Sequence, residues 1–249
     1  MRVNKHFIIV GAQRSGTTYL YNILNEHPEI CMSSPVFPEP KYFLNKPIDR
    51  VNIEQYLENH FPQYNCNDFV ITGEKSTSYY ESEDAARIIS QILPSTKIIF
   101  LLRNPIYRAL SNYFFSCNNG LETRSLEDVF LEMLSPPSYS ESISVNPYNY
   151  LGRGEYVKFI KMYMKYFPSN QIKILIFEEL KDSHNEIEKL YNFLEVSHDF
   201  TPTNLNLAAN SSKDKSAPSE HIIHSLTQYY APFNKELEKL INKNITVWK

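Results

Sequence analysis

The chain has few glycines and cysteines and no long apolar run. Its 249 residues include only 6 glycines and 3 cysteines, at Cys31, Cys66 and Cys117. Three is an odd number, and the spacing fits no zinc site, so reduced thiols are expected. No apolar run approaches the roughly 20 residues that a membrane helix needs, and the N-terminus lacks the pattern of a signal peptide. The sequence therefore predicts a cytoplasmic protein with no integral membrane segment.

Positive charge is also scarce. The formal net charge is −3, with 25 Lys and Arg residues against 28 Asp and Glu residues. A protein that binds nucleic acid through a broad basic surface would carry the opposite sign, so no nucleic-acid partner is expected. The 7 histidines form no ligand pair that a carboxylate or cysteine completes, and no metal site is predicted. The sequence does not indicate an oligomeric state.

Strand and helix patterns alternate along the chain. Short β-branched or aromatic runs predict buried strands at 7–10, 69–71, 97–102 and 172–177. Helical patterns follow from about residue 15, after 104–105, at 155–166, at 183–194 and at 219–242, the last broken near Pro232. This order predicts an α/β chain with a three-layer P-loop-like fold, in which helices flank a central parallel sheet. One domain over residues 1–249 is expected, with irregular segments at 33–47 and 135–150.

The turn after the first strand has the features of an anion-binding loop. It reads "GAQRSGTTYL", with Gly11 and Gly16 spaced as in a phosphate-binding loop. Backbone N–H groups and the helix dipole would face the anion there. Arg14 can form two parallel hydrogen bonds with its oxygens, and Ser15, Thr17 and Thr18 add hydroxyl donors. A helix start with ordinary capping residues is the alternative interpretation.

A second anion-binding point is expected after the third predicted strand. In "KIIFLLRNPIYRALSNYFFS", Arg103 lies at the carboxyl end of a strand and Ser111 on the following helix. Ligands of open α/β sheets bind at this edge. Alone, Arg103 is equally compatible with an ion-pair partner. Together with the glycine turn it indicates a nucleotide that carries phosphate at two separate places.

At these residues the chain resembles the sulfotransferases that use 3′-phosphoadenosine 5′-phosphosulfate (PAPS). "VGAQRSGTTYLYNILNEHPEI" is similar to their 5′-phosphosulfate loop, and "FLLRNPIYRALSNYF" to their 3′-phosphate element. "PEPKYF" and "GEKSTSYY" resemble segments of the branch that contains the heparan sulfate N- and 3-O-sulfotransferases. The motifs occur in the family's order from Phe7 to Trp248, which makes the set more specific than any one motif.

The resemblance implies a role for each matching position. The donor nucleotide would contact Arg14, Ser15, Gly16, Thr17 and Thr18 at its 5′ end and Arg103 and Ser111 at its 3′-phosphate. Lys213 and Lys215, in a late basic loop, would close over the nucleotide. Glu39 would be the general base, and Arg14 and Lys75 would stabilise charge at the transferring group. From the residues alone, an exposed loop carboxylate is the favoured interpretation of Glu39, and a solvated charge after a strand fits Lys75 as well as a catalytic role does.

The function that follows is transfer of a sulfuryl group from PAPS to a hydroxyl or amine of a carbohydrate or small molecule, without a metal. PAPS would be the co-substrate and 3′-phosphoadenosine 5′-phosphate (PAP) the product. The alternative is a P-loop kinase that uses Mg-ATP. A kinase of this class needs a lysine that contacts the phosphates, and Thr17 occupies that position. It also needs an acidic residue that holds Mg²⁺, and only Glu178 and Glu179 could supply it. A third possibility is a non-catalytic nucleotide-binding protein.

Overall fold

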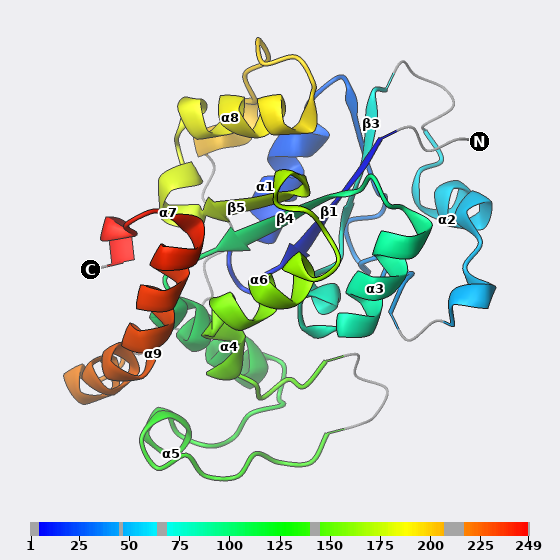
Figure 1. Ribbon diagram of the computed structural model, residues 1–249. Coiled ribbons are helices and arrows are strands. Elements are labelled where there is room, and N and C mark those ends of the chain that lie inside the picture. The colour runs from blue at the N-terminus through cyan, green and yellow to red at the C-terminus, as the bar shows by residue number, and fades with distance from the viewer. Residues whose placement is uncertain (1–4, 45–46, 64–68, 140–144, 207–216, 249) are drawn as a thin grey trace.

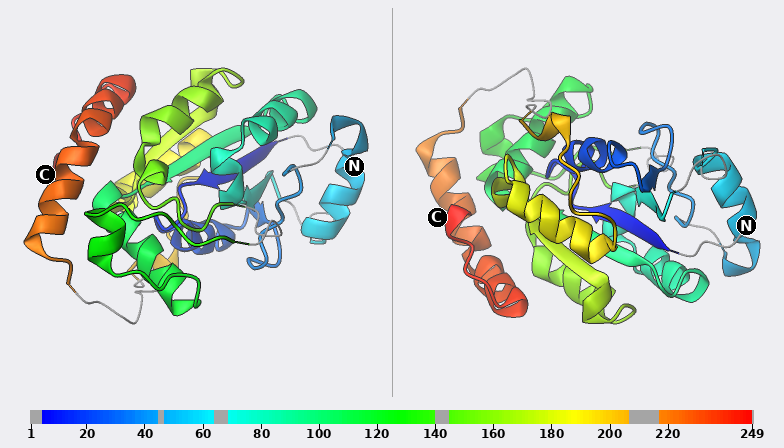
Figure 2. Two further views of the ribbon diagram at one scale, coloured as in Figure 1. Left: turned by 90° about the horizontal axis from the view of Figure 1, so that it is seen from below. Right: turned by 90° about the horizontal axis from the view of Figure 1, so that it is seen from above.

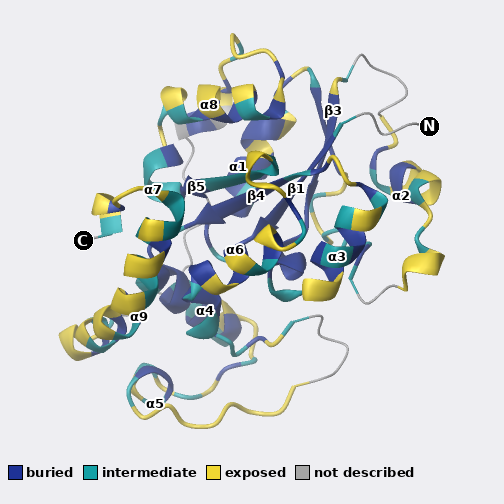
Figure 3. Ribbon diagram, viewed as in Figure 1, coloured by how far each residue is buried: buried dark blue, intermediate teal, exposed yellow. Residues whose placement is uncertain are grey.

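The computed structural model describes residues 5–44, 47–63, 69–139, 145–206 and 217–248 (Figure 1). Its centre is a sheet of five parallel strands in the order β2-β3-β1-β4-β5. The strands are β1 (His6–Gly11), β2 (Ile30–Met32), β3 (Ile71–Lys75), β4 (Lys97–Leu102) and β5 (Ile172–Ile176). The sheet lies in the interior of the molecule (Figure 3). The predicted central parallel sheet is therefore confirmed.

Two features of the sheet differ from the sequence prediction. The strand expected at 69–71 begins at Ile71 and continues through four further residues to Lys75. Its carboxyl half is polar, so it gave no apolar signal, yet all five residues are buried. Glu74 and Lys75 tolerate this burial because each contacts a polar partner, namely Tyr56 and Glu39. The short strand β2 was not predicted at all.

Helices cover both faces of the sheet, which confirms the three-layer architecture (Figure 2). Because side chains alternate along a strand, Ile8 and Phe100 pack against one set of helices and Ile9 and Leu101 against the other. The first face is covered by α2 (Ile53–His60), α3 (Glu83–Ile92) and α6 (Tyr156–Met164), and the second by α1 (Thr17–Asn25) and α8 (His184–Leu194). The short helix α7 (Phe177–Leu180) follows β5 directly.

The remaining helices form a third apolar cluster beside the sheet. It contains α4 (Pro105–Asn118), α5 (Leu126–Phe130) and α9 (Glu220–Ile241). The start of α4 was predicted correctly: the Asn104 side chain accepts a hydrogen bond from the N–H of Ile106, and Pro105 is the first helical residue. Because β4 leads directly into α4, Arg103 is held between them at the carboxyl edge of the sheet.

The break predicted near Pro232 is wrong. Helix α9 continues through this residue from Glu220 to Ile241. A proline inside a helix removes one backbone hydrogen bond and costs about 3 kcal/mol when nothing compensates. Here Leu226 and Tyr230 before Pro232 and Leu237 after it are buried, so packing on both sides holds the helix together. No helix within the described ranges is long and apolar enough to cross a membrane.

Candidate active site

The turn between β1 and α1 has a backbone that only a small residue fits. Gly16 is the N-cap of α1 and has φ 92°, in the left-handed region. A Cβ at this position would lie 2.5 Å from Cδ2 of the Phe177 ring, so glycine is required for space as well as for conformation. The N–H groups of the first helical turn, including those of Thr17 and Thr18, have no partner within the helix. The turn therefore offers backbone donors at the positive end of the α1 dipole.

Two further residues of the turn are suited to an anion. Ser15 is fully buried and its hydroxyl lies near that of Tyr156, but it makes no hydrogen bond of normal geometry with a described residue. Arg14 has φ 67°, a conformation that is uncommon for a residue with a side chain and is enriched at ligand sites. Its guanidinium group reaches towards α4, where Arg14 Nε donates a hydrogen bond to Ser111 Oγ at 3.2 Å.

Residues from separate motifs meet around Arg14. Arg103 Nη1 donates a hydrogen bond to the backbone oxygen of Arg14 at 3.4 Å. The ring of Phe115, one helical turn after Ser111, lies 4.6 Å from Arg14 Cζ. The structure thus brings together Arg14, Ser111 and Arg103, which are far apart in the sequence. Sequence reasoning missed Phe115, although its position four residues after Ser111 predicts the same helix face.

Three arginines gather at this point, and none of them forms an ion pair with a described carboxylate. Burial lowers the pKa of Arg14, and the charges of Arg103 and Arg108 lower it further. Burial also lowers the pKa of Arg103, an effect that Glu178 opposes. Arg108 is fully buried, and in the described part of the chain its Nε has no hydrogen-bond partner and no carboxylate forms an ion pair with it. A bound anion would stabilise all three guanidinium groups.

The two acidic residues considered as metal ligands are occupied by protein contacts. Glu178 accepts hydrogen bonds from the N–H of Asn104 at 2.9 Å and from Nε1 of Trp248 at 3.0 Å. Glu179 forms an ion pair with Lys243. Within the described part of the chain, no group of three or more His, Cys, Asp or Glu side chains is arranged to hold a metal ion.

A buried ion pair lies at the end of β3. Lys75 Nζ is 2.6 Å from Glu39 Oε1, and the exposed fractions of the two side chains are 2% and 10%. Thr77 donates to the same carboxylate from its backbone N–H at 2.9 Å and from its hydroxyl at 3.1 Å. Glu39 and Lys75 are therefore not exposed surface charges, which was the alternative interpretation of both residues from the sequence. Thr77 was missed, although it follows Lys75 by two residues.

The ion pair and the glycine turn occupy the same edge of the sheet. In the β1–β3 register Lys75 is opposite Ile9, two residues before Gly11. The N–H of Ser76 continues this contact by donating to the oxygen of Ile9 at 3.2 Å. Parallel strands end together at this edge, which is where open α/β sheets bind ligands. The exposed Phe37 ring lies over Lys75, with Nζ 4.5 Å from its centroid.

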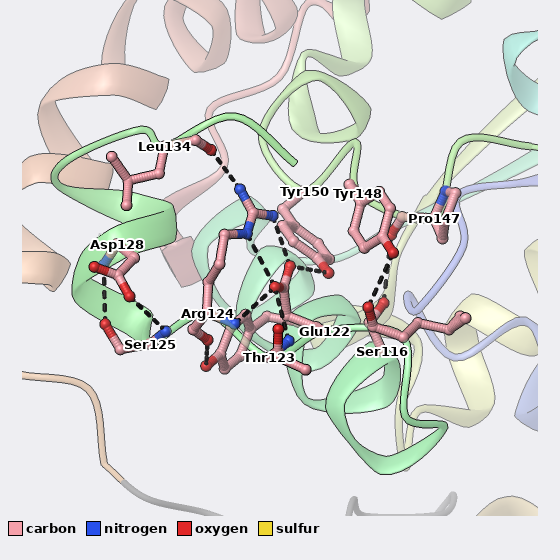
Figure 4. A network of polar contacts seen from close by, with 12 residues as sticks. Ser116, Glu122, Thr123, Arg124, Ser125, Asp128, Leu134, Pro147, Tyr148 and Tyr150 are labelled. Carbon is pink, nitrogen blue, oxygen red and sulfur yellow. Dashed lines mark hydrogen bonds and ion pairs between the residues drawn. The ribbon is translucent and has the colours of Figure 1, made fainter. Parts of the chain in front are cut away.

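Helix α4, which carries Ser111, is anchored by a network of polar contacts. Arg108 donates to Asn112 Oδ1 and to the oxygen of Tyr150. The Tyr150 hydroxyl in turn donates to Glu122 Oε2 at 3.0 Å, and Arg124 forms an ion pair with the same carboxylate at 2.6 Å (Figure 4). These contacts join Tyr150 and the segment at 122–124 to α4. They hold the helix that positions Ser111.

Two candidate residues cannot be placed. Lys213 and Lys215, predicted to close over the nucleotide, lie outside the described residues. The other predicted site residues fall into two groups at one edge of the sheet. Arg103, Ser111 and residues 14–18 form one group, the candidate anion-binding group, and Glu39 and Lys75 form the ion pair.

Comparison with known proteins supports the motif-based resemblance. Residues 4–243 match the family model described as "Sulfotransferase domain". The bifunctional heparan sulfate N-deacetylase/N-sulfotransferase 2 of Homo sapiens is 31% identical over 197 residues, which are 77% of this chain and 22% of that protein. The corresponding enzyme 3 of Homo sapiens is 28% identical over 263 residues, 95% of this chain and 30% of that protein. The chain thus spans less than a third of the length of either relative.

Solved structures share the fold. A sulfotransferase from Alicyclobacillus acidocaldarius has a TM-score of 0.79 and 24% identity, with 99% of both chains covered. Mouse sulfotransferase SULT7A1, solved in complex with PAP, has a TM-score of 0.54 and 15% identity, covering 96% of this chain and 86% of the mouse chain. At these identities the likeness concerns the fold alone, and it agrees with the P-loop-like architecture expected from the sequence.

Proposed function

The chain belongs to the sulfotransferase family, and from this premise we propose that it transfers a sulfuryl group from PAPS to an acceptor hydroxyl or amine. The observation that carries the proposal is the convergence of Arg14, Ser111 and Arg103 beside the glycine turn. Two anion-binding elements at one sheet edge suit a nucleotide with phosphate at both ends. The kinase alternative is not favoured by the family match.

The donor would be held without covalent help from the protein. Arg14, Ser15, Gly16, Thr17 and Thr18 would bind the 5′-phosphosulfate through backbone N–H groups, hydroxyls and one guanidinium group. Arg103 and Ser111 would bind the 3′-phosphate. The buried Ser15 hydroxyl and the cluster of arginines without an ion-pair partner among the described residues both fit an anionic ligand. Lys213 and Lys215 remain candidates for further nucleotide contacts.

Glu39 would act as the general base. An ionised carboxylate offers about four hydrogen-bond acceptor sites, and Lys75, the Thr77 N–H and the Thr77 hydroxyl occupy three of them. The remaining lone pair can take the proton of the hydroxyl or amine that receives the sulfuryl group, because the Glu39 side chain is 10% exposed. The acceptor oxygen or nitrogen forms a bond to sulfur, the bond from sulfur to the phosphate oxygen breaks, and PAP leaves with that electron pair. Arg14 and Lys75 would stabilise the negative charge on the leaving oxygen.

The surroundings of the two cations favour an acceptor with a ring. Phe37 and Phe115 are 60% and 45% exposed, and each ring lies against a proposed catalytic cation, Lys75 or Arg14. The apolar face of a sugar or another small ring can pack on such surfaces. We therefore propose a carbohydrate or small-molecule acceptor. One sulfotransferase domain over residues 1–249 and a cytoplasmic location complete the proposal.

The base is tested by replacing Glu39 with glutamine and measuring labelled sulfate transfer from PAPS in an acceptor screen. Glu39→Gln should lose turnover by about 10²–10⁴-fold, while PAP affinity stays near the unsubstituted value because Glu39 is not in the anion-binding group. Glu83→Gln, which removes the carboxylate of a surface ion pair with Lys165, is the matched control. Equal activity of Glu39→Gln and the unsubstituted protein would reject the base assignment.

The donor is tested by thermal shift with PAP, ADP and Mg-ATP. PAP should stabilise the protein more than either adenine nucleotide that lacks a 3′-phosphate, and Arg103→Ala should remove that preference. The control variant is Arg87→Ala, which removes a surface arginine paired with Asp84. Stabilisation by Mg-ATP alone would support the kinase instead.

A further inference from the structure

The peptide group between Arg103 and Asn104 is held at both of its polar ends. The hydroxyl of Tyr156 on α6 donates a hydrogen bond to the oxygen of Arg103 at 2.6 Å. The N–H of Asn104 donates to Oε1 of Glu178 on α7 at 2.9 Å. This oxygen and this N–H belong to one planar unit, so the two bonds fix its orientation. Because the Cα of Arg103 carries both the peptide and the side chain, the direction in which the guanidinium group leaves the backbone is fixed as well.

Trp248 contacts every group that holds this peptide. Its indole Nε1 donates to the second oxygen of Glu178, Oε2, at 3.0 Å. Its ring lies beside that of Tyr156, with the two centroids 5.8 Å apart. Its backbone oxygen accepts a hydrogen bond from Asn104 Nδ2 at 3.4 Å. Three contacts from one residue therefore converge on the turn from β4 to α4.

The segment that carries Trp248 is firmly docked on the protein. Ile245 is buried in the core, and Trp248 packs against the same apolar cluster. Lys243 forms an ion pair with Glu179 on α7, and Figure 1 shows the segment beside that helix. Trp248 lies beyond the residues that match the family model. Its placement at the turn is therefore a feature of this chain's tertiary structure that the family match does not address.

The indole N–H determines how the carboxylate of Glu178 is oriented. The two oxygens of Glu178 are bonded by donors from two different segments, at Asn104 and Trp248. A carboxylate held at both oxygens cannot rotate, whereas one held at a single oxygen can. Hydrogen bonds weaken steeply when they lose alignment, so the bond from the Asn104 N–H depends on the second bond from Trp248. The carboxylate also lies at the N-terminus of α4, where the helix dipole favours negative charge.

We propose that Trp248 is a positioning residue for the 3′-phosphate, because its indole N–H orients Glu178 and, through Glu178, the peptide that carries Arg103. Trp248 itself contacts neither the nucleotide nor the acceptor. This inference rests on the proposed function, in which Arg103 binds the 3′-phosphate. It adds that the preference for a nucleotide with a 3′-phosphate depends on a residue outside the anion-binding group.

The chain contains a single tryptophan, so replacing all tryptophan with an analogue changes Trp248 alone. Benzothienylalanine, incorporated in a tryptophan auxotroph, has the shape of tryptophan but carries sulfur in place of the indole N–H. Calorimetry gives the affinities for PAP and for adenosine 5′-monophosphate (AMP), which differ only in the 3′-phosphate. In the benzothienyl protein PAP affinity should fall by about tenfold, the effect of one hydrogen bond to a charged group. AMP affinity should not change.

Two further variants make the comparison specific. Trp248→Phe keeps an aromatic ring beside Tyr156 but removes the N–H, and it should lose the same preference for PAP. Tyr166→Phe is the matched control, because it removes an aromatic hydroxyl that donates to Glu83 on the surface at 3.0 Å. It should leave both affinities unchanged.

Amide hydrogen exchange tests the hold on the turn without any nucleotide. The Asn104 N–H should exchange faster in the benzothienyl protein than in the unsubstituted protein, by about tenfold. The control amide is that of Ala85, which donates to Ser82 Oγ at the start of α3 and should exchange at the same rate in both proteins. An unchanged rate at Asn104 refutes the inference whatever the affinities are.

The affinities separate this inference from the function on which it rests. If the unsubstituted protein prefers PAP to AMP and the benzothienyl protein keeps that preference, the role of Trp248 is refuted and the function stands. Equal weakening of PAP and AMP refutes it too, because that pattern reflects a general loss of structure. If the unsubstituted protein binds PAP no better than AMP while exchange at Asn104 accelerates as expected, the proposed donor fails and the hold of Trp248 on the turn stands.

Discussion

The buried pair between Glu39 and Lys75 allows the two residues to be tested for coupling. Their side chains are 10% and 2% exposed, and the N–O distance is 2.6 Å. Removing one partner of such a pair leaves a buried charge without compensation, which typically costs about 3–5 kcal/mol. The two single substitutions should nevertheless differ, because the partners left behind have different surroundings.

Glu39→Ala should be the more damaging substitution. It leaves the Lys75 ammonium nearly inaccessible to water and against the ring of Phe37, so a loss of about 3–4 kcal/mol in the free energy of unfolding is expected. Lys75→Met leaves Glu39 with both donors of Thr77 and some access to water, so about 2 kcal/mol is expected. For a chain of this size the larger loss lowers Tm by about 6–16 °C.

The double variant provides the decisive measurement. Glu39→Ala/Lys75→Met removes both charges together, so it should cost less than the sum of the single losses, by about 2–3 kcal/mol. Urea unfolding of the four proteins, monitored by fluorescence and circular dichroism, gives the coupling free energy directly. If the losses are additive within about 0.5 kcal/mol, the pair does not form in solution, and the placement of Glu39 as base loses its structural support.

Two other substitutions test the site and its support. Gly16→Ala should destabilise the protein by about 2–4 kcal/mol and weaken PAP binding, because the strain of a left-handed backbone adds to the contact with Phe177. Thermal shift measures the loss. The control is Gly120→Ala, at φ 69° with open space around it, which should show only the smaller backbone cost. Burial raises the pKa of Glu122, but hydrogen bonds from Arg124 outweigh it and the net pKa lies below 4.5. The stability that ionised Glu122 contributes is present above pH 4.5 and is lost as the pH falls through its lower folded-state pKa. The urea midpoints of Glu122→Gln and the unsubstituted protein should therefore converge on acidification. A difference that stays constant with pH would contradict the ion pair between Glu122 and Arg124.

The sequence by itself determined the fold class and the anion-binding turn. Runs of β-branched residues are buried wherever they occur in a parallel sheet, so their order and the helices between them indicate three layers. The anion-binding turn also depends only on neighbouring residues, because Gly16, the hydroxyl residues after it and the helix that follows are sufficient to expose backbone donors. The start of α4 at Asn104 and Pro105 could likewise be predicted from the sequence, because helix capping depends only on neighbouring residues.

Only the tertiary structure decided which distant residues meet. The contacts of Arg14 with Ser111 and of Lys75 with Glu39 span 97 and 36 positions, and no local pattern encodes such distances. The polar half of β3 was missed because its burial depends on partners from other elements, Glu39 and Tyr56, that compensate Lys75 and Glu74. The unbroken course of α9 through Pro232 likewise depends on packing that a single helix does not contain. Local propensity sets the elements, and long-range compensation of charge and backbone decides how they assemble into a site.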